Sequence, residues 1–302
     1  METFWVIVIV ILAAYVVANV VVYFLQERLI FKPEKLPADF KFKYDEHHFE
    51  EYNLAIEPGV NINGVHFRVE NPKGVVLYLK GNSRSIKGWG KFAIDFTRFN
   101  YDVVMIDYRG FGKSTGYRTE EGIKHDLQRV YDKLKKQVKE KYIILYGRSL
   151  GSGFATHLAS YNHPRMLVLD APYYSVKHIA KRYLPFMSMS LILRFPVETY
   201  KWIKYVDCPI SIIHGTKDKL ISFSTSKKLA KINTQRTKLY PVFGGGHNNL
   251  HTFEEYHRVL EEVLAYDADT DRMINDTLYS TLPRHDVNPD SSSLNFGKKK
   301  KR

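Results

Sequence analysis

The stretch YIILYGRSLG occupies residues 142–151 and joins an apolar run to the motif Gly147-Arg148-Ser149-Leu150-Gly151. Small residues follow the motif at positions 152, 153 and 155, which favours a helix that packs closely on its neighbours. A serine flanked by glycines between a buried strand and such a helix lies on a sharp turn, which presents its hydroxyl at the carboxyl edge of a sheet. The stretch therefore predicts a strand, a turn carrying Ser149 as a candidate nucleophile, and a helix.

Short apolar runs recur on both sides of this stretch, and they are continuous rather than alternating. They occupy residues 75–79, 103–106, 166–169, 210–213 and 237–240. Continuous runs are typical of strands covered on both faces. Helical patterns separate them, one of which is predicted to begin after the N-cap Thr119. The alternation predicts an α/β fold with a mostly parallel sheet and right-handed crossovers.

Two local signals refine the ends of this pattern. Residues 49–69 contain two β-rich stretches, and Asn61-Ile62-Asn63-Gly64 between them predicts the turn of a hairpin. Near the other end, Thr252 to Glu255 matches a capping box, which predicts the start of the last helix.

The composition excludes several classes of protein. The 302 residues are 44% hydrophobic and 25% charged, which excludes disorder of the whole chain. Cys208 is the only cysteine, which excludes a disulfide scaffold, and no cysteine or histidine spacing indicates a zinc site. The net charge of +13 favours an acidic partner, either nucleic acid or an anionic membrane surface. No nucleic-acid-binding motif accompanies the charge, so we expect no nucleic-acid partner.

The first segment of the chain is almost entirely apolar. Residues 4–25 read FWVIVIVILAAYVVANVVVYFL, in which Asn19 and the hydroxyls of Tyr15 and Tyr23 are the polar groups. As a helix this segment would be about 33 Å long, enough to cross a membrane. A cleaved signal peptide fits poorly, because a basic leading region and a small-residue cleavage site are missing. A buried core helix is the alternative, but such helices rarely carry so few polar residues.

Basic residues follow this segment and predict its orientation. Arg28, Lys32 and Lys35 place the bulk of the chain in the cytoplasm by the positive-inside rule. We expect a single-pass anchor over residues 1–28, a connector over 29–48, and an α/β domain over 49–266. The tail, 267–302, is expected to be disordered, and its final basic run either binds anionic lipid headgroups or is merely solvated.

Two further candidates follow strands of the predicted sheet. Asp218 ends the stretch HGTKD after the run at 210–213, and His247 lies in FGGGHN after the run near 239. Because carboxyl ends of parallel strands meet at one edge, we expect both beside Ser149 as orienting acid and general base. Asp218 as a simple turn residue, and His214 or His251 as the base, are the alternatives.

An anionic reaction intermediate at Ser149 would need hydrogen-bond donors. The backbone N–H of Leu150, directly after the nucleophile, is the first expected donor. The second is expected from the loop Lys80-Gly81-Asn82-Ser83 after the first parallel strand, with Asn82 N–H preferred over Ser83 N–H.

At this point the chain resembles the α/β-hydrolase superfamily, and within it the membrane-anchored serine hydrolases similar to α/β-hydrolase-domain-containing proteins thirteen and seventeen. The matching segments are KGN (80–82), DYRGFGKS (107–114), YGRSLG (146–151), DAPY (170–173), HGTKD (214–218) and GGH (245–247). They cover roughly residues 60–265 in family order. The resemblance implies an eight-stranded sheet, a Ser149–Asp218–His247 triad and hydrolysis of an ester or thioester.

One departure from the family pattern concerns the loop before the expected second donor. The family usually has His-Gly-Asn where this chain has Lys80-Gly81-Asn82. The expected donor is a backbone N–H, so the replacement of the histidine by Lys80 should leave it in place. The change would alter the packing of the loop or add positive charge near the acyl site.

An insertion at about 173–206 is expected to form a helical cap over the site. Its apolar side chains would bind an acyl chain, touch the bilayer or simply pack on the core. The sequence thus predicts a membrane-anchored serine hydrolase that needs no cofactor and acts on an acyl ester, lipid or acyl-protein substrate. A serine peptidase of the same fold and a membrane adaptor without catalysis are the alternatives.

Overall fold

The computed structural model describes residues 1–44 and 47–265, and the tail expected to be disordered lies outside this part. One sheet of eight strands has the order β1-β2-β4-β3-β5-β6-β7-β8. The strands are β1 (His48–Glu57), β2 (Val60–Arg68), β3 (Val75–Leu79), β4 (Asp102–Ile106), β5 (Ile143–Arg148), β6 (Met166–Asp170), β7 (Ile210–Gly215) and β8 (Thr237–Val242). β2 is antiparallel to β1 and β4, and all other pairs are parallel. The predicted fold class is confirmed.

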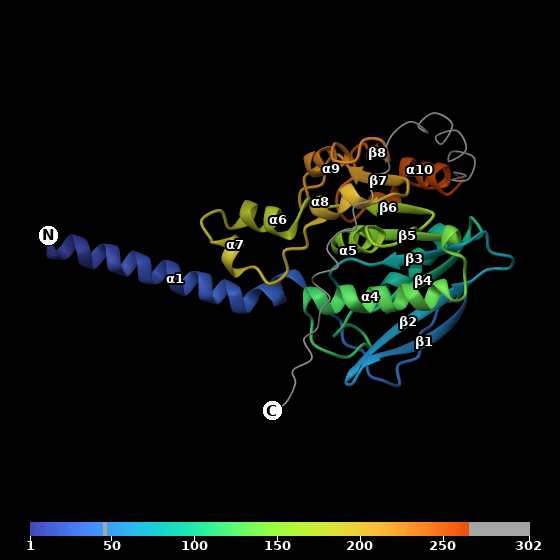
Figure 1. Ribbon diagram of the computed structural model, residues 1–302, viewed down its shortest axis with the longest axis horizontal. Coiled ribbons are helices and arrows are strands. Elements are labelled where there is room, and N and C mark those ends of the chain that lie inside the picture. The colour runs from blue at the N-terminus through green and yellow to red at the C-terminus, as the bar shows by residue number, and fades with distance from the viewer. Residues whose placement is uncertain (45–46, 266–302) are drawn as a thin grey trace, which may run out of the picture. The chain divides into compact units, whose positions relative to one another are not determined.

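Helices cover both faces of this sheet (Figure 1). They are α1 (Glu2–Ile30), α2 (Ile86–Trp89), α3 (Ile94–Thr97), α4 (Glu120–Lys135), α5 (Leu150–Ala159), α6 (Val176–Tyr183), α7 (Met189–Ile192), α8 (Thr199–Trp202), α9 (Phe223–Ala230) and α10 (Glu254–Ala265). Short 3-10 turns lie at Gly90–Ala93, Glu140–Tyr142, Ile203–Tyr205 and Leu250–Thr252. α4, α5 and α9 pack on one face, and α2, α3 and α10 pack on the other. Alternate residues of β3 and β5 enter the two cores, which explains why the strand runs are continuously apolar.

The predicted N-cap of α4 is confirmed, whereas the predicted hairpin turn at 61–64 and the predicted capping box of the last helix are wrong. Thr119 caps α4, since its hydroxyl accepts a hydrogen bond from Gly122 N at 2.9 Å. The hairpin turn lies at Pro58–Gly59 instead of residues 61–64, because Gly59 supplies the positive φ of 79° that the turn requires. Gly64 is inside β2, where a Cβ would collide with the ring of Tyr52.

The expected capping box at the last helix is also absent. Thr252 lies in a 3-10 turn, and its hydroxyl donates to Asn249 O at 2.9 Å. Glu255 accepts a hydrogen bond from Phe243 N instead of the Thr252 backbone. α10 therefore begins at Glu254, and its first turn is tied to the loop after β8.

α1 is long and apolar enough to cross a membrane, and two of its 29 residues, Asn19 and Gln26, are buried. The segment directly after α1 is hydrogen-bonded to the α/β domain. Lys32 N donates to Asn82 O at 2.8 Å, and Gly112 N donates to Glu34 O at 2.7 Å. The start of the expected connector is therefore docked against the loops that follow β3 and β4.

The connection from β5 to α5 is a sharp turn at Ser149, whose φ of 50° and ψ of −118° lie outside the regions that most residues adopt. Two hydrogen bonds hold the turn: Ser149 N donates to Asp170 O, and Ser152 N donates to Ser149 O, both at 2.9 Å. α5 then passes so close to β3 that a Cβ at Gly151 would collide with the carbonyl oxygen of Leu79. The glycine at 151 is therefore required by packing.

We expect Gly151→Ala to lower the free energy of unfolding by about 1–3 kcal/mol, because backbone atoms of β3 cannot yield to the added methyl group. Denaturation of the detergent-solubilised protein, followed by circular dichroism, measures this loss. Gly88→Ala is the matched control, since its Cβ would meet only the flexible side chain of Arg84 at 3.4 Å. Equal stability of the two variants would contradict the packing argument.

Candidate active site

Three predicted side chains meet at the carboxyl edge of the sheet. Ser149 Oγ lies 2.9 Å from His247 Nε2, and His247 Nδ1 lies 2.7 Å from Asp218 Oδ2. The three residues follow β5, β8 and β7, respectively. Residues far apart in sequence thus form one continuous chain of hydrogen bonds.

Asp218 accepts four hydrogen bonds. Its Oδ1 accepts from Leu220 N and Ile221 N, both at 2.8 Å, and its Oδ2 accepts from His247 and from His214 Nε2 at 3.1 Å. Burial raises the pKa of Asp218, but the hydrogen bonds from His214 and His247 and the charge of His247 outweigh it and hold the pKa well below its usual range. Asp218 is therefore ionised, and it orients His247 with Nδ1–H toward itself and Nε2 toward Ser149.

The other candidate histidines have different partners. His214 is fully buried, with Nδ1 2.6 Å from Ser226 Oγ and Nε2 facing both Asp218 and Ile221 O. It is thus a second donor to Asp218. His251 packs edge-on against Phe92, with ring centroids 5.2 Å apart. Of these three histidines, His247 is the one that is hydrogen-bonded to Ser149.

Two backbone N–H groups beside Ser149 have no acceptor among the described residues. Leu150 is the first residue of α5, where an N–H lacks a partner within the helix. Asn82 N also makes no described hydrogen bond, while its side chain donates to Ile30 O at 2.7 Å and its carbonyl accepts from Lys32 N. Both residues line the same cavity as Ser149.

Lys80, the departure from the family pattern, is fully buried. Its Nζ lies 3.4 Å from Asp107 Oδ1 and donates to Arg84 O at 3.2 Å. Burial lowers the pKa of Lys80 to about 8, against the opposing effect of Asp107, and burial raises the pKa of Asp107 to about 6. Asp107 also accepts from Ile86 N at 3.1 Å. The lysine thus packs the loop at 80–86 onto the end of β4, and it does not line the cavity.

The cavity next to Ser149 has a volume of about 440 Å³. Its lining residues carry no charged side chain. They come from α1, from the loop at 82, from the turn at Ser149 and the start of α5, from α6 and α7 with the residues that follow each, and from the loops after β6 and β7. They are Val22, Gln26, Leu29, Ile30, Asn82, Ser149, Leu150, Tyr173, Val176, Ile179, Ala180, Tyr183, Leu184, Met189, Leu193, Leu220 and Ile221. The insertion at about 173–206 contributes α6 and α7 to this lining. The contribution of α1 was not expected, although Gln26, a polar residue at the end of an apolar run, was a signal.

Within residues 1–44 and 47–265, no three His, Cys, Asp or Glu side chains gather in a way that could hold a metal ion.

We expect Lys80→Met to cost about 3–5 kcal/mol in the free energy of unfolding, because it leaves Asp107 buried without its cation. The double variant with Asp107→Asn should lose less than the sum of the single losses, since the buried charge is then gone. Denaturation curves of the four proteins measure this coupling. Lys87→Met, which removes an exposed ion pair with Glu34, serves as the control and should cost at most about 1 kcal/mol. Additive losses at 80 and 107 would refute the pairing.

Comparison with known proteins finds similar sequences among hydrolases. The family model described as serine aminopeptidase, S33, matches residues 70–205. The lysophosphatidylserine lipase ABHD12 of Xenopus tropicalis is 30% identical over 178 residues, which are 52% of this chain and 46% of the lipase. The same lipase of Gallus gallus is 27% identical over 220 residues, 63% of this chain and 58% of the lipase. The chain thus spans about half the length of these relatives.

Solved structures show the same fold. An esterase of Pyrococcus furiosus is 20% identical with a TM-score of 0.61, covering 77% of this chain and 96% of the esterase. The α/β hydrolase GrgF of Penicillium is 13% identical with a TM-score of 0.60, covering 72% and 96%. With this sheet and these matches, the chain has the α/β-hydrolase fold, and its sequence is similar to those of the lysophosphatidylserine lipases ABHD12.

Proposed function

We propose that this chain is a membrane-anchored serine hydrolase that cleaves the acyl ester or thioester of a lipid or acylated protein, with a lipid ester favoured. The observation that carries the proposal is the hydrogen-bonded chain Ser149–His247–Asp218 at the wall of an apolar cavity of about 440 Å³. A nucleophile with a base and an orienting acid is the arrangement that acyl transfer requires.

In the proposed reaction, His247 Nε2 takes the proton of Ser149 Oγ as the oxygen attacks the acyl carbonyl carbon. The backbone N–H groups of Leu150 and Asn82 stabilise the negative charge that develops on the carbonyl oxygen. His247 then gives its proton to the leaving oxygen or sulfur, and the bond to the acyl carbon breaks. Water attacks the acyl-enzyme with His247 again as base, which releases the acid and restores Ser149. Asp218 stabilises the imidazolium in both steps.

The lining of the cavity supports an acyl substrate. Its side chains are uncharged and mostly apolar, so a hydrocarbon chain fits the cavity and a charged headgroup finds no counter-ion there. Two matched relatives are named as lysophosphatidylserine lipases, and a lysophospholipid carries one such chain in ester linkage. Both observations favour a single-chain lipid ester.

Membrane anchoring is part of the proposal and rests on α1. Its length and apolar composition suit one bilayer crossing. Arg28, Lys32 and Lys35 after the apolar run favour a cytoplasmic catalytic domain.

The peptidase alternative has one observation in its favour, the description of the matching family model as a serine aminopeptidase. An aminopeptidase must bind the positively charged amino terminus of its substrate, for which a carboxylate is the natural partner. No carboxylate lines the cavity of this chain. The lining therefore favours the ester.

We expect a fluorophosphonate probe to label the wild-type protein in membranes and to leave Ser149→Ala unlabelled. Ester hydrolysis should fall by roughly 10⁴-fold or more in Ser149→Ala and His247→Ala, because each loses a member of the hydrogen-bonded chain. His251→Ala is the control and should keep both labelling and hydrolysis. A folded wild type that is neither labelled nor active on any ester would favour the adaptor without catalysis.

A second prediction separates the two catalytic functions. The wild type should hydrolyse long-chain acyl esters of 4-methylumbelliferone and leave aminoacyl-methylcoumarin amides uncleaved, because the apolar cavity offers no partner for an ammonium group. Fluorescence release at equal substrate concentration compares the two. Faster cleavage of the amides would establish the peptidase.

A further inference from the structure

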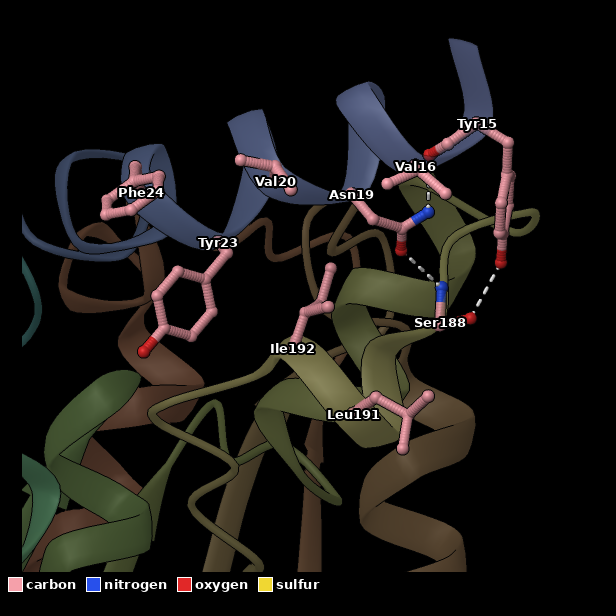
Figure 2. A pocket seen from close by; sticks show the side chains of 9 residues that line it. All are labelled: Tyr15, Val16, Asn19, Val20, Tyr23, Phe24, Ser188, Leu191 and Ile192. Atoms are coloured by element: carbon pink, nitrogen blue, oxygen red, sulfur yellow. Dashed lines mark hydrogen bonds between the residues drawn. The ribbon is translucent and has the colours of Figure 1, made fainter. Parts of the chain in front are cut away.

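α1 and α7 enclose a second hollow, of about 310 Å³, which we call the α1–α7 groove. Figure 2 shows Tyr15, Asn19 and Tyr23 of α1 pointing toward the short cap helix, and Ile192 of that helix pointing back toward α1. The lining residues are Tyr15, Val16, Asn19, Val20, Tyr23, Phe24, Ser188, Leu191 and Ile192. Phe24 and Leu191 are 69% and 85% exposed, so the mouth of the groove is an apolar surface on the helix proposed to lie in the bilayer.

One turn of helix divides this groove from the cavity beside Ser149. Met189, the first residue of α7, and Leu193, directly after its end, line the cavity, whereas Leu191 and Ile192 line the groove. α1 contributes to both hollows as well, with Val20, Tyr23 and Phe24 in the groove and Val22, Gln26 and Leu29 in the cavity. The same two segments therefore form walls of both hollows.

The two buried residues of α1, Asn19 and Gln26, hold α7 in its position between the groove and the cavity. Ser188 N donates to Asn19 Oδ1 at 3.0 Å, Arg194 N donates to Gln26 Oε1 at 2.6 Å, and Gln26 Nε2 donates to Ile192 O at 2.8 Å. Asn19 and Gln26 are seven residues apart, so both amides point from one side of α1. In an apolar phase no water replaces such bonds, and α7 is therefore fastened at both ends to the anchor helix.

We propose that the α1–α7 groove is the entry site for one acyl chain of a bilayer lipid, which reaches the cavity beside Ser149 along α1, the helix that lines both hollows. This inference rests on the proposed function and names the route by which its substrate arrives. The residues that line the groove indicate that its ligand is a hydrocarbon chain. Tyr15 and Ser188 bond to each other through their hydroxyls, Asn19 bonds to the Ser188 backbone, and no charged side chain lines the groove. A hydrocarbon chain needs none of these polar groups, whereas an ion would find no side chain of opposite charge in the groove.

The test uses the full chain in phosphatidylcholine nanodiscs with two substrates that share a leaving group. 4-Methylumbelliferyl oleate enters the bilayer, and 4-methylumbelliferyl acetate reaches Ser149 from water. Val20→Trp fills the groove and should lower kcat/KM for the oleate by roughly tenfold or more, with hydrolysis of the acetate unchanged. Val21→Trp is the matched control, since Val21 lines neither hollow, and it should change neither rate.

Equal losses on both substrates in Val20→Trp, or an unchanged rate on the oleate, would overturn the entry site and leave the proposed function standing. A wild type inactive on both esters would instead refute the proposed function and the delivery to Ser149 together.

A second measurement does not depend on turnover. Ser149→Ala in nanodiscs is irradiated with a diazirine-bearing oleoyl ester, and crosslinked peptides are mapped. We expect crosslinks within 15–24 and 188–192 that excess unlabelled oleoyl ester removes and that Val20→Trp weakens. Crosslinks that the competitor leaves unchanged would show ordinary contact with bulk lipid and would overturn the site.

Discussion

The strained backbone of Ser149 is the constraint on which the site depends. A residue with a side chain at φ 50° and ψ −118° costs about 1–3 kcal/mol, so the surroundings must enforce it. Asp170 O receives the N–H of Ser149, and Ser152 binds its carbonyl through both N–H and hydroxyl. The close passage of α5 over β3 follows from this turn, and it leaves no room for a side chain at Gly151. One turn thus sets the direction of α5, the position of the Ser149 hydroxyl and the free N–H of Leu150.

The order of the strands then explains why Asp218 and His247 lie beside Ser149. β6, β7 and β8 lie in sequence beside β5, all parallel, so the loops after β7 and β8 come to the same edge as the turn at Ser149. Asp218 is held there by two backbone N–H groups and by the buried His214, and its charge fixes the ring of His247. His214 therefore holds the Asp218 carboxylate in place without contacting Ser149.

Most of the fold and of the candidate site could be predicted from local sequence patterns and from the rules of parallel-sheet topology. The turn at Ser149, the parallel strands and the residues after β7 and β8 could be predicted because carboxyl ends of parallel strands converge whatever their spacing in sequence. Contacts between segments that are distant in sequence could not be predicted. Gln26 pairs with residues 192–194, and Lys80 with Asp107, and nothing local to either residue indicates its partner. The hairpin was misplaced for a different reason: Asn-Gly is a strong turn signal, but Gly64 is needed inside β2 for its packing against Tyr52.

The participation of α1 in the cavity also changes what can discriminate between substrates. An acyl chain that moves from water into an apolar cavity gains about 0.8 kcal/mol per buried methylene. A chain that moves there from a bilayer gains little, because lipid tails are as apolar as the side chains of the lining. On the proposed substrate, chain length therefore contributes little to the choice between lipids. On this proposal, that choice comes from the shape of the route and from the polar groups at its end, where Leu150 N–H and Asn82 N–H are the proposed donors to the ester carbonyl.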